Sequence, residues 1–308
     1  MRAVIAALFI CIALPAQAEL VEQSRWLMGT ELRIVLEAGD RSDDIVESMF
    51  RECFETVARC ESVLSRFDPT AELARLNASA GHEVEVSAEL FAWIGRCALD
   101  SRRTRGAFDP SVGTWILDPR SKLEVGMEKV MRDASRQAVF LPEGMALDSG
   151  GDGKGVAVDL IVARLKQEGY RGLVSFGGSS SYGLGKGPEH DGWPLAVMDV
   201  KGRWIGTVIL RDAALSISHS LLVEQLGDGR TKSRQHIYDP ETGELIRRER
   251  TAIVRSPSAT DAEVLSTALI VRGARGMDFV DQFPGSEALL TPLPGHLPDW
   301  WEAPSQRD

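Results

Sequence analysis

The hydrophobic pattern of this 308-residue chain changes at about residue 138, and the change limits the folds that the chain can adopt. Before this point, apolar residues recur every three or four positions, as in a helix with one buried face. After it, short apolar runs such as 173–176, 195–198 and 207–210 are separated by glycines, as in the strands of a sheet. Helices and strands that cluster instead of alternating predict an α+β fold.

The spacing of apolar residues predicts four helices. The first covers about 43–64 and has its apolar stripe at Ile45, Met49, Cys53, Val57, Cys60 and Leu64. The second begins after Ser87, whose hydroxyl can cap a helix N-terminus. The others are expected at about 154–168 and 260–273, and a strand is expected at 32–36.

The N-terminus is typical of a secretory signal peptide. Arg2 supplies a positive charge, residues 3–14 form an apolar run, and Ala16-Gln17-Ala18 is a small-x-small cleavage signature. The apolar run is shorter than the roughly 20 residues that cross a bilayer, although an uncleaved anchor remains the alternative. We therefore predict a signal peptide at 1–18, a periplasmic mature protein and no transmembrane segment in the mature chain.

Charge and cysteine content narrow the function classes further. The formal net charge is −10 and there is no long basic run, which argues against a nucleic-acid partner. Cys53 and Cys60 are seven residues apart on the first expected helix, about 10 Å along its axis, so they are too far apart for a disulfide. We expect them to be small core residues.

The chain behind the signal peptide has the length of one large domain, which we place at 19–285. Residues 286–308 contain several prolines and the pair Trp300-Trp301, and we expect an extended tail there. The simplest interpretation of the two tryptophans is that they cover the edge of a core.

A glycine-dense stretch at 148–155 precedes the third expected helix. Its sequence is Asp-Ser-Gly-Gly-Asp-Gly-Lys-Gly. Glycines allow a ligand to approach the backbone, a helix N-terminus offers free N–H groups to phosphate, and Lys154 adds a positive charge. The stretch is not a P-loop, because Gly155 and not Ser or Thr follows the lysine. It predicts either a phosphate-bearing ligand or a tight turn without one.

Two further positions could support chemistry. His236 stands beside an Asp-Pro turn and could be a general base or a structural residue. Glu263 and Thr267 are four apart on an expected helix, so their oxygens share one face and could bind a hard cation such as Mg²⁺. The alternative for this segment is a solvated acidic helix start.

In their order along the chain, these segments resemble the FAD:protein FMN transferase (ApbE) family over about residues 26–275. The similarity rests on six motifs: Met28-Gly29-Thr30; Ser65-Arg66-Phe67 with the following 72–77; Gly106-Ala107-Phe108-Asp109-Pro110-Ser111-Val112-Gly113; Lys154-Gly155 with Asp159; Gly177-Gly178; and His236 through Gly243. Each motif is weak alone, but their common order is specific.

The resemblance implies an α+β fold with mixed β-sheets flanked by helices, related to T-folds. It also implies an activity that cleaves FAD and attaches FMN through a phosphoester to a Thr or Ser of a target flavoprotein, here one of a membrane or periplasmic redox system. His236 would be the catalytic base, and Mg²⁺ would lie between Glu263, Thr267 and the carbonyl of Gly151. The FAD site would comprise Met28, Phe67, Ala107, Phe108, Asp109, Asp148, Lys154, Gly177 and Gly178.

Three places differ from the family pattern. Glu263 stands where the family has aspartate, Ile217-Ser218-His219 replaces Thr-Ser-Gly, and Asp152-Gly153 replaces an apolar-small pair. A carboxylate at position 152 could repel a pyrophosphate or join the metal. Two alternatives therefore accompany the transferase: a non-catalytic FAD-binding or partner-binding protein, and a Mg²⁺-dependent FAD pyrophosphatase.

Overall fold

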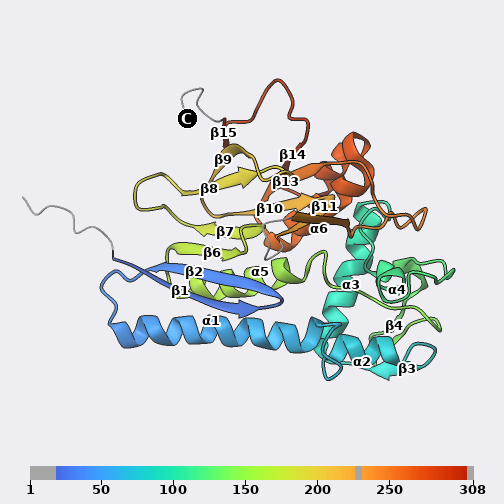
Figure 1. Cartoon of the computed structure of the whole chain (residues 1–308). Coiled ribbons are helices and arrows are strands. Elements are labelled where there is room, and N and C mark those ends of the chain that lie inside the picture. Colours follow the sequence, from blue (N-terminus) through green and yellow to red (C-terminus); the bar gives the residue numbers. More distant parts are fainter. Residues whose placement is uncertain (1–18, 226–230, 304–308) are drawn as a thin grey trace, which may run out of the picture.

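The computed structural model describes residues 19–225 and 231–303, so the predicted signal peptide at 1–18 lies outside the described residues. The fold is α+β, as predicted (Figure 1). None of the helices in the described part is long and apolar enough to cross a membrane.

The main sheet has seven strands in the order β1-β2-β6-β7-β10-β13-β14. Every neighbouring pair in it is antiparallel, so the mixed sheet that the resemblance implied is wrong in strand direction for the described strands. Tight turns impose this direction on β1–β2, at Met28-Gly29, and on β6–β7, at Gly177-Gly178, and all four turn residues have positive φ. The strands are β1 (Leu20–Leu27), β2 (Thr30–Glu37), β6 (Gly172–Phe176), β7 (Ser180–Leu184), β10 (Ala213–His219), β13 (Thr251–Ser256) and β14 (Glu287–Leu290).

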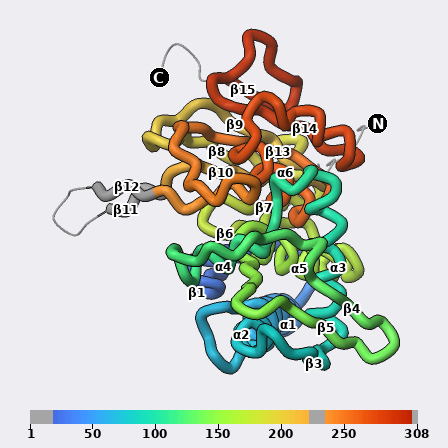
Figure 2. The backbone as a smooth tube through the Cα atoms, turned by 90° about the vertical axis from the view of Figure 1, so that its right-hand side faces the viewer, coloured from blue at the N-terminus to red at the C-terminus, as the bar shows by residue number. Residues whose placement is uncertain are grey.

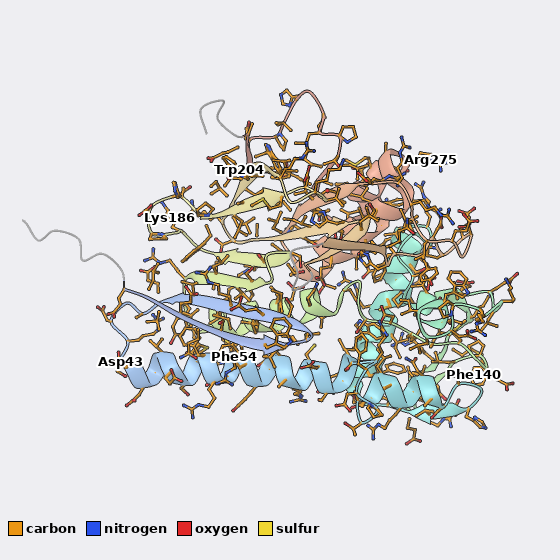
Figure 3. The ribbon with its side chains drawn as sticks, viewed as in Figure 1. Asp43, Phe54, Phe140, Lys186, Trp204 and Arg275 are labelled. Atoms are coloured by element: carbon orange, nitrogen blue, oxygen red, sulfur yellow. The ribbon has the colours of Figure 1, made fainter. Side chains whose placement is uncertain are left out.

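Three helices form the layer that packs with this sheet. They are α1 (Asp43–Leu64), α5 (Gly153–Gln167) and α6 (Ala259–Arg272). α5 contacts both of the others, and α6 contacts β10 and β13. In Figure 1, α1 lies at the β1–β2 end of the stack of strands, and Figure 3 shows Phe54 on the side of α1 that faces β1. The guanidinium of Arg25 on β1 lies 4.3 Å from the centre of the Phe54 ring.

The buried stripe of α1 differs from the predicted one at its first position. Ile45 is 55% exposed, and Val46 is buried in its place. Met49, Cys53, Val57, Cys60 and Leu64 are buried as predicted. The three cysteines in the described part of the chain are free and buried, which fits core residues.

The remaining helices and strands lie around this centre. α2 (Glu72–Ala78) and α3 (Ala88–Arg103) follow α1, and Ser87 caps α3 by accepting a hydrogen bond from the Leu90 amide. The short elements are β3 (Glu83–Glu85), η1 (Pro110–Val112), α4 (Gly113–Leu117), η2 (Met127–Lys129), β4 (Met131–Asp133), β5 (Ala138–Phe140), β11 (Leu221–Gln225), β12 (Thr231–Gln235) and η3 (Gly273–Gln282).

A second core lies on the opposite face of the main sheet. Side chains of β13 alternate, so that Val254 faces the helices and Ile253 faces a three-stranded sheet of order β15-β9-β8. Its strands are β8 (Trp193–Met198), β9 (Trp204–Leu210) and β15 (Trp301–Glu302).

The segment 286–308, which we expected to be an extended tail, supplies one strand to each of the two sheets. β14 joins the main sheet and β15 pairs with β9, at the end of the molecule opposite α1 (Figure 2). Leu289 and Trp301 are buried in the second core. The apolar side chains of the segment explain this docking, because they cover a sheet face that would otherwise be exposed to water.

Candidate active site

A pocket of about 500 Å³ lies between the first turn of α5, one side of α6, the loop 106–113, the end of β10 and the segment after β12. This volume is in the range of sites for small molecules and cofactors. Nine of the predicted site residues line it: Ala107, Phe108, Asp109, Asp148, Gly151, Lys154, His236, Glu263 and Thr267. The structure therefore brings together residues that are more than 150 positions apart in the sequence.

Four predicted FAD-site residues do not belong to this lining. Met28 lies in the β1–β2 turn, where its amide donates to the carboxylate of Glu61 at 3.1 Å. Phe67 is 80% exposed, and the guanidinium of Arg66, which does line the pocket, lies 4.0 Å from the centre of its ring. Phe67 is thus next to the pocket wall and not part of it.

Gly177 and Gly178, the other two, form the turn between β6 and β7. Both have positive φ values, 52° and 74°, which favour glycine. The chain then reaches Ser179 and Ser180, which line the pocket. The two glycines therefore do not line the pocket themselves, but their turn places Ser179 and Ser180 in its wall.

Asp109 fixes the loop wall of the pocket, residues 106–113. Its Oδ1 accepts a hydrogen bond from the Ser111 amide and its Oδ2 one from the Met127 amide, each at 3.0 Å. Burial raises the pKa of Asp109, while these hydrogen bonds and that of the Ser101 hydroxyl lower it in part. With its oxygens committed to the protein, Asp109 orients Phe108 and Ala107 toward the cavity.

The glycine loop 148–155 packs directly on this wall. The Asp148 amide donates to the carbonyl of Pro110 at 2.8 Å, and the Asp148 carboxylate forms an ion pair with Arg66. The loops approach so closely that a Cβ at Gly113 would lie 2.6 Å from the carbonyl carbon of Leu147. Glycine is therefore required at position 113.

Glu263 occupies the helix wall, where α5 and α6 meet. It is 5% exposed, and its Oε2 accepts a 2.6 Å hydrogen bond from the Gly155 amide in the first turn of α5. A carboxylate at a helix N-terminus is stabilised by the helix dipole. Its Oε1 contacts the hydroxyl of Ser180 and lies 3.8 Å from the ammonium of Lys154.

Two neutral oxygens lie on the same wall. The Thr267 hydroxyl is 3.5 Å from the carbonyl oxygen of Gly151, one helical turn after Glu263. Within residues 19–225 and 231–303, no three His, Cys, Asp or Glu side chains are grouped so that they could hold a metal ion. A cation at this wall would thus be held by one carboxylate and neutral oxygens.

Asp152 does not take the position that the sequence suggested. It is 1% exposed, and its carboxylate accepts a 2.8 Å hydrogen bond from the indole N–H of Trp93 on α3. Burial raises the pKa of Asp152 well above its usual value. The expectation that it could repel a pyrophosphate or join a metal is therefore wrong, because the side chain turns into the core and does not belong to the pocket lining.

Asp159, the acidic member of the Lys154-Gly155 motif, also has a structural place. Its carboxylate accepts hydrogen bonds from the amides of Ala259 and Thr260, at 2.7 and 3.0 Å, and from the Ser258 hydroxyl. It therefore fixes the start of α6 against α5, and so positions Glu263.

The segment after β12 closes the pocket. His236 begins it, and the segment turns back at Asp239, whose amide donates to the carbonyl of Glu244 at 2.8 Å. Tyr238 packs against Trp115, with ring centres 5.9 Å apart. These contacts hold His236 at the cavity.

The sequence missed several lining residues on β7 and β10. Ser216 and Ser218 share the hydroxyl of Ser266 on α6, at 2.9 and 2.8 Å. His219 also lines the pocket, its Nδ1 is 3.0 Å from the Thr251 hydroxyl, and burial lowers its pKa. Its departure from the family pattern was the only signal that pointed to it.

Comparison with known proteins agrees with this geometry. A family model described as the ApbE family matches residues 28–290. Among solved structures, an ApbE protein from Thermotoga maritima is 24% identical, with a TM-score of 0.76, over 92% of this chain and 97% of that one.

Two further structures share the fold. The flavin transferase ApbE from Vibrio cholerae is 22% identical, with a TM-score of 0.72, over 89% of this chain and 93% of that one. The flavinyl transferase ApbE from Pseudomonas stutzeri is 21% identical, with a TM-score of 0.73, over 89% of this chain and 91% of that one. The comparison with curated protein sequences gave no match.

Proposed function

Because this chain belongs to the ApbE family, we propose that it is a FAD:protein FMN transferase, which moves FMN from FAD to a Thr or Ser of an acceptor flavoprotein. The observation that carries the proposal is the single pocket in which the loop 106–113, Lys154 and His236 meet. Two solved structures of the same fold are named flavin or flavinyl transferases.

The pocket offers matching surfaces for the two ends of FAD. Arg66 and Lys154 contribute positive charge beside the first turn of α5, where a pyrophosphate is stabilised by cations and by the helix N-terminus. Phe108, Ile116 and Ile217 offer an apolar wall for the flavin ring. We assign the pyrophosphate to the helix wall and the ring to the loop wall.

His236 is the proposed general base. Its imidazole accepts the proton of the acceptor hydroxyl, and the hydroxyl oxygen attacks the phosphorus on the FMN side of the pyrophosphate. A new P–O bond forms to the acceptor, the P–O bond to the AMP phosphate breaks, and AMP leaves with the electron pair. Lys154 and Arg66 stabilise the negative charge that develops on the phosphates.

Mg²⁺ is the proposed cofactor. The carboxylate of Glu263, the hydroxyl of Thr267 and the carbonyl of Gly151 are hard oxygen donors on one wall, which is the donor type that Mg²⁺ prefers. When bound, the ion would neutralise charge on the pyrophosphate. To bind it, Glu263 must share or release the amide of Gly155, to which it is bonded here.

Export supports the choice of partner. The predicted signal peptide would deliver the protein to the periplasm, and we propose an acceptor flavoprotein of a periplasmic or membrane redox system. This assignment predicts that the mature chain meets its FAD outside the cytoplasm.

The test combines the purified mature protein, FAD, Mg²⁺ and a tagged FMN-acceptor domain. We expect covalent flavin fluorescence on the acceptor, and its loss in EDTA. Release of FMN and AMP without labelling would indicate a FAD pyrophosphatase, and FAD binding without either product would indicate a binding protein. Both outcomes would contradict the proposed transferase.

A further inference from the structure

A patch of positive charge lies beside the pocket of this acidic protein. We define the arginine patch as Arg248, Arg250 and Arg275. Arg250 is half-buried, and its guanidinium donates to the carbonyls of Ile270 and Val271 at the C-terminal end of α6, at 2.7 and 3.3 Å. Val271 also lines the pocket, so Arg250 contacts a residue of the pocket wall directly.

The other two arginines are exposed and close to Arg250. Burial and the positive charges of Arg248 and Arg275 lower the pKa of Arg250, so both cations lie near enough to repel its guanidinium. Figure 3 shows Arg275 at the outer edge of the molecule, above α3.

Neighbouring acidic side chains do not neutralise this repulsion. Among the described residues, none of the three patch arginines takes part in an ion pair. The nearby acids pair with other cations: Glu249 with Lys201 at 3.4 Å, Asp278 with Arg105 at 2.8 Å, and Glu241 with Arg272 at 2.8 Å. The patch is therefore a positive surface without an internal counter-charge.

The position of the patch relates it to the reaction. The chain runs from His236 through the bridge between Tyr238 and Leu245 directly to Arg248 and Arg250. An acceptor whose hydroxyl reaches His236 therefore lies at the start of the segment that leads to the patch. We propose that the arginine patch is the docking surface for an acidic face of the acceptor flavoprotein, an inference that rests on the proposed transferase function.

Charge explains why such a surface would be selective. The net charge of −10 repels acidic partners from most of the molecule, so a local positive patch next to the site orients them. The attraction acts on association and weakens with salt. Its effect on FAD binding should be smaller than its effect on the acceptor, because FAD contacts the cavity and not the patch.

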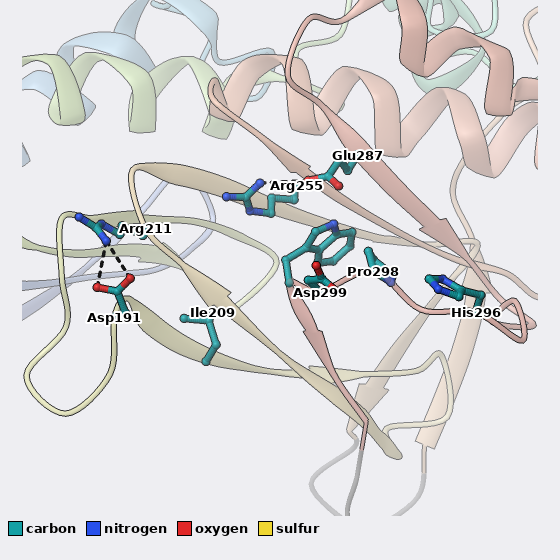
Figure 4. A pocket seen from close by; sticks show the side chains of 9 residues that line it. Asp191, Ile209, Arg211, Arg255, Glu287, His296, Pro298 and Asp299 are labelled. Atoms are coloured by element: carbon teal, nitrogen blue, oxygen red, sulfur yellow. Dashed lines mark hydrogen bonds and ion pairs between the residues drawn. The ribbon is translucent and has the colours of Figure 1, made fainter.

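A second cavity, of about 640 Å³, is the alternative docking site. It lies between β9, β13, β14 and the segment 296–300 (Figure 4). Its two arginines already have acidic partners: Arg211 pairs with Asp191 at 2.7 Å, and Arg255 with Glu287 at 3.0 Å. It has no excess of positive charge to attract an acidic protein.

The experiment uses short peptides with one central threonine, flanked either by glutamates or by glutamines. In the wild type at low salt, we expect kcat/KM for FMN transfer to be about tenfold higher for the glutamate peptide, and the difference to vanish at high salt. In the double variant Arg248→Glu/Arg275→Glu, the preference should disappear or reverse. Equal rates for both peptides in the wild type would overturn the proposal.

Arg51→Glu/Arg75→Glu is the matched control. Both of its arginines are exposed and lie on α1 and α2, away from the pocket, and the control changes the net charge by the same amount. It should keep the glutamate preference, and a loss of preference there too would overturn the role of the patch.

Anisotropy of labelled peptides, measured in EDTA without turnover, separates this proposal from the proposed function. Tighter binding of the glutamate peptide to the wild type, but not to the double variant, supports the docking surface even if no FMN is transferred. FAD binding reports that each variant is folded. Equal binding of both peptides by folded wild type overturns the docking surface whether or not FMN is transferred.

Discussion

The two walls of the pocket hold their buried carboxylates in different ways. On the loop wall, Asp109 accepts two backbone amides of its own surroundings, so its hydrogen bonds are completed within the protein. On the helix wall, Glu263 bonds to the Gly155 amide and lies 3.8 Å from the ammonium of Lys154, a partly exposed cation on a long side chain. The first carboxylate determines the shape of the site, whereas the second can exchange partners for a ligand.

This difference explains which wall tolerates substitution of its carboxylate residue. The aspartate of the loop wall matches the family motif, and its bonds require a short side chain at the start of η1. The helix wall carries glutamate where the family has aspartate, and the longer side chain reaches α5 and β7 together. Variants of both walls test whether shape and charge are divided between them in this way.

The largest effect is expected at His236, which belongs to neither wall. His236→Ala should reduce FMN transfer by about a hundred- to ten-thousandfold, because a general base contributes that much to the rate. FAD affinity should stay within about twofold, because the imidazole acts on the acceptor proton. Transfer rates and FAD fluorescence titrations measure the two quantities. An unchanged transfer rate would show that His236 is not the general base, and that the residues of the two walls carry out the reaction without it.

The next effect concerns the loop wall. Asp109→Ala leaves the buried amides of Ser111 and Met127 without acceptors, so it should lower the free energy of unfolding by about 2–4 kcal/mol. FAD affinity should fall as well, because Phe108 loses its fixed position. Urea unfolding and FAD titration check these outcomes.

Asp133→Ala is the matched control for Asp109→Ala. Asp133 accepts the amide of Ser135 at 2.9 Å and its hydroxyl at 2.6 Å, the same turn chemistry as Asp109 with Ser111, but it is only partly buried and also pairs with Arg136 at the surface. Water replaces the lost acceptor there, so a much smaller loss of stability is expected. Equal losses in both variants would show that burial does not distinguish the loop wall.

The elements of the fold could be predicted from the sequence because their signals are local. The first helix was predicted with its observed bounds, and α5 and α6 are each shifted by one residue. The apolar stripe fixes the buried face, but the choice between Ile45 and Val46 depends on where the sheet lies, which no local pattern contains. β14 was missed for the same reason, since a short strand is defined by the neighbour with which it pairs.

The site was predicted unevenly. The ordered motifs, together with the family resemblance that rests on them, identified nine lining residues, because motifs combine backbone and side-chain requirements over several positions. Ser180 and Ser216 were missed because a single hydroxyl in a strand has no local signal. The direction of Asp152 could not be predicted either, because it depends on Trp93, which lies on another helix.

Asp152 provides a third carboxylate, which faces neither wall. Its raised pKa means that the folded protein favours the protonated form. Its contribution to stability is therefore complete below the unfolded pKa of about 3.8 and is lost as the pH rises through the folded pKa. Asp152→Asn keeps an acceptor for Trp93 but does not ionise. Relative to the wild type, it should gain about 1.4 kcal/mol for each pH unit between the two pKa values.

Urea unfolding at several pH values measures this difference, with FAD affinity as the second readout. FAD affinity should not change, because the Asp152 side chain lies in the core. A variant with the same pH dependence as the wild type would mean that Asp152 is ionised in the folded state. The helix wall would then have the negative charge of Asp152 close to it in addition to that of Glu263.

The smallest effect tests the helix wall itself. In Glu263→Asp, the side chain is shorter by one methylene and no longer reaches the Gly155 amide. Mg²⁺ then does not have to compete with this hydrogen bond for the carboxylate. We expect Mg²⁺ affinity to rise about tenfold, a change typical of altered hydrogen bonding around a metal ligand. The free energy of unfolding should fall by about 1 kcal/mol, because the Gly155 amide loses its partner. Isothermal titration with Mg²⁺ alone measures the affinity without turnover.

Thr267→Val, made in both backgrounds, tests whether the ion measured is the one assigned to this wall. It removes the hydroxyl that lies 3.5 Å from the Gly151 carbonyl, so it should weaken Mg²⁺ binding in the wild type and in Glu263→Asp alike. If Thr267→Val leaves binding unchanged, the cation binds elsewhere. Glu263 would then resemble Asp109, as a carboxylate whose bonds are complete within the fold, and the contrast between the two walls would be wrong.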